Sequence, residues 1–152
     1  TGGDPARLYA LRQLFDAAGI PCSISDDITR EVWLKFAWNS IFNMTTTVAG
    51  VTVEELYEHP ETVRLCYDLF GEIQQAAAAC DVRLGDEDGK KLIEESRSLT
   101  GFTTSTYHDR QQGKRLEYEA FTGAILRLAN AEGLKVPVNR TIYALLKLID
   151  EG

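Results

Sequence analysis

The chain has 152 residues, of which 44% are hydrophobic and 26% are charged, and its formal net charge at pH 7 is −7. This length and composition predict one ordinary globular domain with a real core, and they argue against long disordered segments. The acidic balance argues against a nucleic-acid partner, and the lack of a long apolar run argues against a membrane span.

The chain has three cysteines, Cys22, Cys66 and Cys80, which form no C-x-x-C pattern and no Cys/His cluster. An odd number in this arrangement predicts neither a disulfide framework nor a metal site. We expect each cysteine to be a small residue that fills the core. Free cysteines and the lack of a signal peptide at the start of the chain predict a reducing, cytoplasmic location.

The opening segment predicts one helix and one short strand. Asp4 and Pro5 can cap and open a helix that Gly19 ends. The following "GIPCSISDD" contains β-formers, which predict a short strand without partner strands in this chain. The chain does not begin with Met. We expect residues 1–25 to be the tail of a preceding domain, or a linker, and residues 26–152 to be a helical domain.

The rest of the chain carries repeated helix-start signals, which include N-cap residues, a capping box and prolines at first helical positions. They fall at Asp26, Asp27 or Thr29, which are alternative N-cap candidates, at Thr52 with Glu55, at Pro60 and at Pro137. Residues 98–115 are polar and show the least helical periodicity, which returns from residue 116 to residue 133. The pattern predicts an all-α domain of six to eight helices.

Three polar residues interrupt an otherwise apolar helix in "EVWLKFAWNSIFNMTTT", which spans residues 31–47. Lys35, Asn39 and Asn43 are four residues apart, so an α-helix places them along one narrow stripe. The stripe is either the solvated face of an amphipathic helix or one wall of a polar cleft. Asn is a poor helix former, whereas amides and an ammonium suit a small oxygen-rich ligand.

A second polar group lies later in the chain, where Ser105 and Glu117 flank "TYHDRQQGKRL". Glu117 precedes an apolar helical pattern, and the helix dipole tolerates a carboxylate at a helix start. These two residues are therefore either helix-capping groups or parts of a second site.

Taken together, the two groups resemble the C-terminal substrate domain of the ketopantoate reductases (2-dehydropantoate 2-reductases). The first motif is the lysine with asparagines four and eight residues later, in "WLKFAWNSIFN". The second motif lies in "TSTYHDRQQGKRLEYEAFTGAILRLANAEGLKVPVN". Its matching positions are Ser105, Asp109, Gly113, Lys114, Glu117, Gly123, Gly133 and Pro137.

This resemblance implies an all-helical domain of the 6-phosphogluconate-dehydrogenase-like type, preceded by a remnant helix and short strand of a dinucleotide-binding (Rossmann) domain. It also implies the NADPH-dependent reduction of ketopantoate to pantoate, on the route to pantothenate and coenzyme A. Lys35 would be the general acid, and Glu117 would orient that lysine or bind near the cofactor's nicotinamide ribose. Asn39 and Asn43 would hold the substrate's hydroxyl, and Ser105 would contact its carboxylate.

The sequence departs from the family pattern in two respects. No G-x-G-x-x-G follows a strand, so we expect NADP to be bound mainly by an N-terminal domain that this chain lacks, and the chain alone to be inactive. Val53 stands where family members often carry a polar residue. The substrate could therefore be a different 2-oxo acid. A non-catalytic helical interaction module is the other alternative, and a homodimer is compatible with the sequence.

Overall fold

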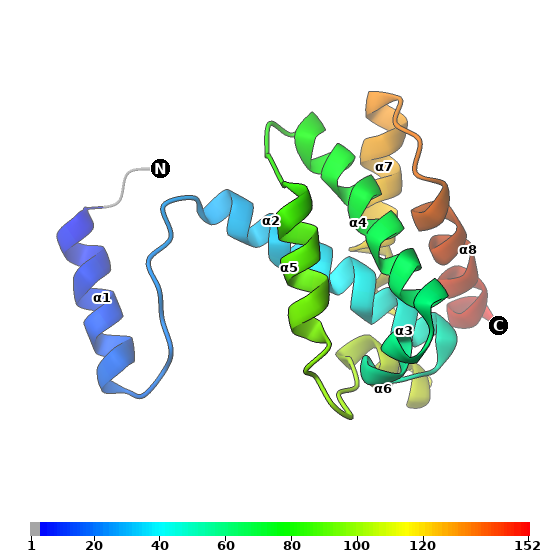
Figure 1. The fold of residues 1–152 in the computed structure, drawn as a ribbon, viewed down its shortest axis with the longest axis horizontal. Coiled ribbons are helices and arrows are strands. Elements are labelled where there is room, and N and C mark those ends of the chain that lie inside the picture. The colour runs from blue at the N-terminus through cyan, green and yellow to red at the C-terminus, as the bar shows by residue number, and fades with distance from the viewer. Residues whose placement is uncertain (1–3) are drawn as a thin grey trace.

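The computed structural model describes residues 4–152 as helices joined by loops, with no strand in that range (Figure 1). No helix among these residues is both long and apolar enough to cross a membrane. The α-helices are α1 (Pro5–Ala17), α2 (Ile28–Trp38), α3 (Met44–Ala49), α4 (Pro60–Ala79), α5 (Asp86–Ser96), α6 (Ser105–Gln111), α7 (Thr122–Glu132) and α8 (Pro137–Glu151). A π-helical turn, η1 (Asn39–Asn43), and two 3₁₀ turns, η2 (Glu54–Glu58) and η3 (Glu117–Glu119), complete the chain.

Helix α1 stands apart from the other helices and buries none of its residues (Figure 1). Its predicted start is confirmed, because the Asp4 side chain accepts a hydrogen bond from the Ala6 amide and Pro5 is the first helical residue. Its predicted end is confirmed by Gly19, which adopts a φ of +70°. Residues 1–3 lie outside the described residues, and the division at residue 25 remains a prediction.

The predicted short strand between α1 and α2 is wrong. Residues 20–27 connect the two helices without forming a strand, and Ile20 and Ile24 are exposed. β-forming side chains favour a strand only where a neighbouring strand completes the hydrogen bonds. Residues 4–152 provide no such neighbour.

Helices α2 and α3 form one long helix through the centre of the bundle, joined by the π turn η1. Of the three predicted N-cap candidates, Asp27 caps its start by accepting a hydrogen bond from the Arg30 amide. The hydroxyls of Thr45 and Thr46 donate to the carbonyl oxygens of Ile41 and Phe42 at 2.6 Å. These bonds satisfy backbone acceptors beside the π turn, where the regular α-helical bonding pattern is interrupted.

Helices α4, α5, α6 and α8 pack against this central helix, and α7 packs against α4 and α8. Helix α4 begins at Pro60 and α8 at Pro137, as predicted. The two are joined by Glu72, a buried residue of α4 whose carboxylate accepts from the backbone amides of Val138 and Asn139 at 2.7 and 2.8 Å. A carboxylate of α4 therefore caps the start of α8, where unpaired amides otherwise remain.

The capping box at Thr52 and Glu55 is confirmed. The Thr52 amide donates to the Glu55 carboxylate at 2.7 Å, and the Glu55 amide donates to the Thr52 hydroxyl at 3.3 Å. The box opens the 3₁₀ turn η2 rather than a full α-helix.

The segment with the weakest periodicity contains helix α6. The Thr104 hydroxyl caps it by accepting from the Tyr107 amide at 3.3 Å. Gly113 follows the helix with a φ of +63°, a left-handed conformation that favours glycine. Seven residues are too short for a periodic pattern to stand out from the sequence.

The cysteines do not all fill the core. Cys66 is buried, as expected, but Cys80 is exposed and Cys22 is half-buried. Cys80 follows the last residue of α4, where the chain turns toward α5 on the surface, so its side chain has no core to enter.

Candidate active site

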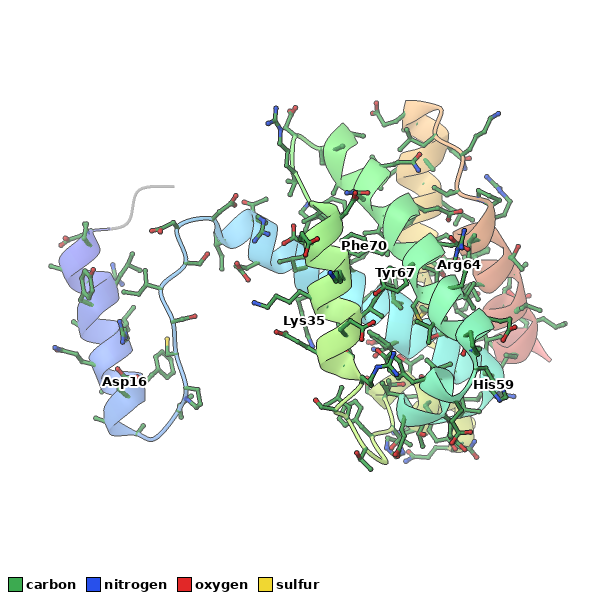
Figure 2. All side chains as sticks on the ribbon, viewed as in Figure 1. Asp16, Lys35, His59, Arg64, Tyr67 and Phe70 are labelled. Atoms are coloured by element: carbon green, nitrogen blue, oxygen red, sulfur yellow. The ribbon has the colours of Figure 1, made fainter. Side chains whose placement is uncertain are left out.

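Lys35 lies on the surface of α2, at the margin of the bundle nearest α1 (Figure 2). Its ammonium nitrogen is 4.7 Å from the centroid of the Trp38 ring, within the range of a cation–π contact. No carboxylate among residues 4–152 forms an ion pair with it. Lys35 is therefore a cation held in place by an aromatic ring and open to an incoming ligand.

The two asparagines of the stripe lie in the π turn η1. Asn39 is half-buried and Asn43 is only 5% exposed. Neither side-chain amide forms a hydrogen bond with another residue of the described chain. The stripe thus runs from the surface into the interior, which disfavours a plain solvated face.

The π turn also keeps the three polar residues on one line along the helix. In a regular α-helix, four residues rotate slightly more than one full turn, so positions four apart drift steadily around the axis. A π turn is wider, so each residue rotates less about the axis, and the four residues from Asn39 to Asn43 stop short of a full turn. Asn43 therefore returns toward the line of Lys35. π turns inside α-helices are frequent at functional sites.

Ser105 is the exposed first residue of α6, which packs against η1 and α3. The contact includes a buried hydrogen bond of 3.0 Å between the hydroxyls of Thr46 and Thr104, the residue before Ser105. The start of α6 is therefore fixed beside the helix that carries the asparagines.

Glu117 is exposed at the start of the 3₁₀ turn η3, rather than at the start of an α-helix. Phe121, just after η3, packs against Phe36 of α2 with 5.9 Å between ring centroids. This contact brings the segment after Glu117 beside the turn that carries Lys35. Within residues 4–152, however, no ion pair or hydrogen bond joins Glu117 to Lys35.

Several other residues of the second motif have structural explanations. A Cβ at Gly123 would lie 2.5 Å from a carboxylate oxygen of Glu119, so that position admits only glycine without a shift. Gly133 ends α7 with a φ of +68°, and Pro137 opens α8. Lys114 pairs with Asp109 at 3.7 Å. These residues shape the fold, whereas Ser105 and Glu117 remain free for a ligand.

A groove between α2 and α5, which we call the α2–α5 groove, has a volume of about 540 Å³. Its lining consists of Arg30, Glu31, Leu34, Lys35, Trp38, Asp88, Lys91, Leu92, Glu95, Ser96 and Leu99. It contains Lys35 but none of the other four predicted site residues. Sequence reasoning missed its α5 wall, because only the three-dimensional packing places residues 88–99 beside α2.

Sequence reasoning also missed the structural roles of Arg110 and Phe102. Arg110, on α6, donates hydrogen bonds to the carbonyl oxygens of Thr47 and Val48 and so caps the end of α3. Phe102, in the loop after α5, packs edge-on against Trp38 with 6.1 Å between ring centroids. The available signal was a single phenylalanine in an otherwise polar stretch.

Residues 4–152 contain no sheet and so no strand–turn–helix unit of the kind that cradles a pyrophosphate. Of the predicted site residues, only Glu117 was expected to lie near the cofactor.

Fold and site together define an all-helical domain that presents one unpaired lysine and two free amides along its central helix. The family model described as "Ketopantoate reductase PanE/ApbA C terminal" matches residues 27–150, and the chain belongs to this family. The 2-dehydropantoate 2-reductase of Aquifex aeolicus is 30% identical over 156 residues, which cover 95% of this chain and 50% of that protein.

Solved structures share the fold. A PanE/ApbA family ketopantoate reductase from Ralstonia eutropha is 28% identical with a TM-score of 0.84, covering 94% of this chain and 48% of that one. A D-mandelate dehydrogenase, solved with NADH and anilino(oxo)acetate, is 20% identical with a TM-score of 0.86, and the match covers 98% of this chain and 64% of that one. The chain spans about half the length of the curated relatives it matches.

Proposed function

We propose that this chain is the substrate-binding and catalytic part of a cytoplasmic, NADPH-dependent 2-oxo-acid reductase. 2-Dehydropantoate, reduced to pantoate for pantothenate and coenzyme A synthesis, is the first substrate to test. The observation that carries this proposal is an unpaired lysine that begins a stripe of two free amides on one helix. Its partner would be a Rossmann domain in the same protein, which would hold the dinucleotide.

The chemistry required matches the groups that this stripe presents. Reduction of a ketone adds a hydride to the carbonyl carbon and a proton to its oxygen. The hydride would come from NADPH held by the cofactor domain, with NADP⁺ as the oxidised product. The ammonium of Lys35 would stabilise the negative charge that develops on the oxygen and donate the proton. Because Lys35 is exposed, solvent can return that proton after each turnover.

The amides and the hydroxyl would orient the substrate. Asn39 and Asn43 can hold polar groups of a small acid without adding charge, and Ser105 can donate a hydrogen bond to its carboxylate. Glu117 would orient Lys35 or contact the cofactor ribose once the cofactor domain is in place.

A reductase of a different 2-oxo acid is the second candidate. Val53, at the position where family members often carry a polar residue, is completely buried among core side chains. It therefore offers no group to a substrate hydroxyl. The D-mandelate dehydrogenase that shares this fold was solved with a 2-oxo-acid analogue that carries an aromatic group.

The test is an assay of NADPH oxidation by the natural full-length protein that contains this chain, with 2-dehydropantoate and a set of other 2-oxo acids. We expect turnover with at least one of them, and product analysis should show the 2-hydroxy acid. A folded full-length protein that oxidises NADPH with no 2-oxo acid would overturn the proposal in favour of a non-catalytic helical module.

A further inference from the structure

The α2–α5 groove separates its charges from its apolar surface. Arg30 forms an ion pair with Asp88, and Lys91 pairs with Glu95 at 3.9 Å. Lys35 is the lining cation that has no carboxylate partner in the described chain. The remaining lining consists of four largely apolar residues, Leu34, Trp38, Leu92 and Leu99, together with Ser96 and with Glu31, whose carboxylate lies 3.8 Å from Arg30. A ligand that enters the groove therefore meets one available ammonium beside an apolar wall.

The ring of Trp38 is fixed in this wall. Its indole N–H donates to the Ser96 hydroxyl at 2.9 Å, and that hydroxyl donates to the Leu92 carbonyl oxygen at 2.8 Å. Ser96 is only 4% exposed, so the bond ties α2 to α5 away from solvent. The ring face is thus held in position before any ligand arrives, and its one polar atom is already paired.

Phe102 extends the aromatic surface toward α6. It is 43% exposed, which is unusual for a large aromatic side chain, yet its loop is held in place. The Val53 amide donates to the Phe102 carbonyl oxygen at 3.0 Å, and the Gly101 amide donates to the Glu54 carboxylate at 2.9 Å. Three residues later the chain reaches Ser105. The backbone that carries the exposed ring is therefore held in place, and the ring itself packs against Trp38 of the groove.

We infer that the α2–α5 groove receives the side group of the 2-oxo acid, and that it selects an aromatic or branched aliphatic group over the hydroxylated group of 2-dehydropantoate. This inference rests on the proposed function. The Lys35 ammonium is 4.7 Å from the Trp38 ring centroid. A ketone oxygen bound to that ammonium therefore places the neighbouring side group within reach of the ring.

The apolar part of the groove also disfavours a hydroxyl. The leucines offer no hydrogen-bonding side chain, and the indole N–H is already bonded to Ser96. A substrate hydroxyl placed against the leucines and the Trp38 ring would lose its water without gaining a partner among them, whereas an apolar group would gain from burial. Trp38 and Phe102 are thus specificity-determining residues, and Lys35 keeps its chemical role for either substrate.

The experiment compares kcat/KM of the natural full-length protein for phenylglyoxylate, 3-methyl-2-oxobutanoate and 2-dehydropantoate, with saturating NADPH. We expect the first or second to exceed 2-dehydropantoate by about tenfold or more, the scale on which apolar pockets discriminate. Leu99→Gln, which places an amide in the groove, and Phe102→Ala, which removes an exposed ring, should each lower that ratio.

Leu145→Gln is the matched control, because Leu145 is 40% exposed on α8 and does not line the groove. It should leave the ratio unchanged. Two results overturn this inference and leave the proposed function standing. The first is a kcat/KM ratio that favours 2-dehydropantoate. The second is a ratio that neither Leu99→Gln nor Phe102→Ala changes while both variants stay folded. Absence of turnover with all three acids overturns this inference, and only absence of turnover with the whole set of 2-oxo acids overturns the proposed function as well.

Discussion

Cys66 shows how strongly position alone sets the chemistry of a side chain in this domain. The thiol is buried in α4, and burial raises its pKa from 9.0 to about 12. Burial disfavours the thiolate because that charge would lose its water in the core. Cys80, fourteen residues later, lies on the surface at the end of the same helix.

This difference predicts selective alkylation. With iodoacetamide near pH 8, Cys80 should react in the native protein, whereas Cys66 should react only after unfolding, because the thiolate is the nucleophile. Peptide mass mapping with and without denaturant measures this.

Folding raises the Cys66 pKa, so this thiol has no effect on stability at any pH below the ordinary thiol pKa. The folded state then loses stability as pH rises from there toward 12. Rapid native labelling of Cys66 would contradict the burial.

At the same scale, the sequence predicted part of the candidate site. Lys35, Asn39 and Asn43 share one helix, so their spacing alone indicated a common stripe. The placement of Asn43 in the interior did not follow from spacing, because burial depends on helices that pack on η1 from elsewhere in the chain, among them α4 and α6. For the same reason Phe102 was missed, since its contact with Trp38 also joins distant parts of the chain.

Helix starts are the elements that the sequence predicted best, because a cap is made by residues within one turn. The starts at Pro5, Pro60 and Pro137 all follow this rule. The short strand failed because a strand depends on a partner that local residues do not specify. The π turn was not predicted either. It interrupts the helix by one wider turn, which leaves the apolar pattern nearly unchanged.

The attachment of α8 to α4 depends on Glu72, whose buried carboxylate accepts three hydrogen bonds, two from backbone amides and one from the Asn139 side chain at 2.9 Å. We expect Glu72→Gln to lower the free energy of unfolding by about 2 kcal/mol, because the new NH₂ group cannot accept from an amide. Urea denaturation measures this. Glu61→Gln, an exposed change on the same helix, is the control and should change little. Equal midpoints for both variants would show that the carboxylate does not anchor α8.

At the scale of the whole molecule, α1 contributes little to the helical bundle. Its apolar side chains are exposed in residues 4–152, and they include Leu8, Leu11, Leu14 and Phe15. An exposed apolar face of this kind marks a surface for another protein part. Under the proposed function, that part is the cofactor domain. A homodimer that covers this or another surface remains a prediction.

Removal of residues 1–26 should therefore leave the bundle intact, because α1 buries nothing and Asp27 keeps the cap of α2. We expect the free energy of unfolding to change by less than about 0.5 kcal/mol, the usual range for surface changes. Urea denaturation of residues 27–152 beside the 152-residue chain measures it. A clearly lower midpoint for the shorter chain would mean that α1 supports the bundle.

The proposed function depends most on Lys35 as the proton donor, and the kinetics of Lys35→Ala in the natural full-length protein test that role. With a 2-oxo acid that the unaltered protein reduces, kcat should fall by about 10²–10⁴-fold, the usual contribution of a general acid. KM should change much less, because the lost interaction belongs to the transition state. Lys90→Ala, which removes an exposed lysine of α5 outside the groove, should leave both constants unchanged. A Lys35→Ala protein with an undiminished kcat would contradict the account.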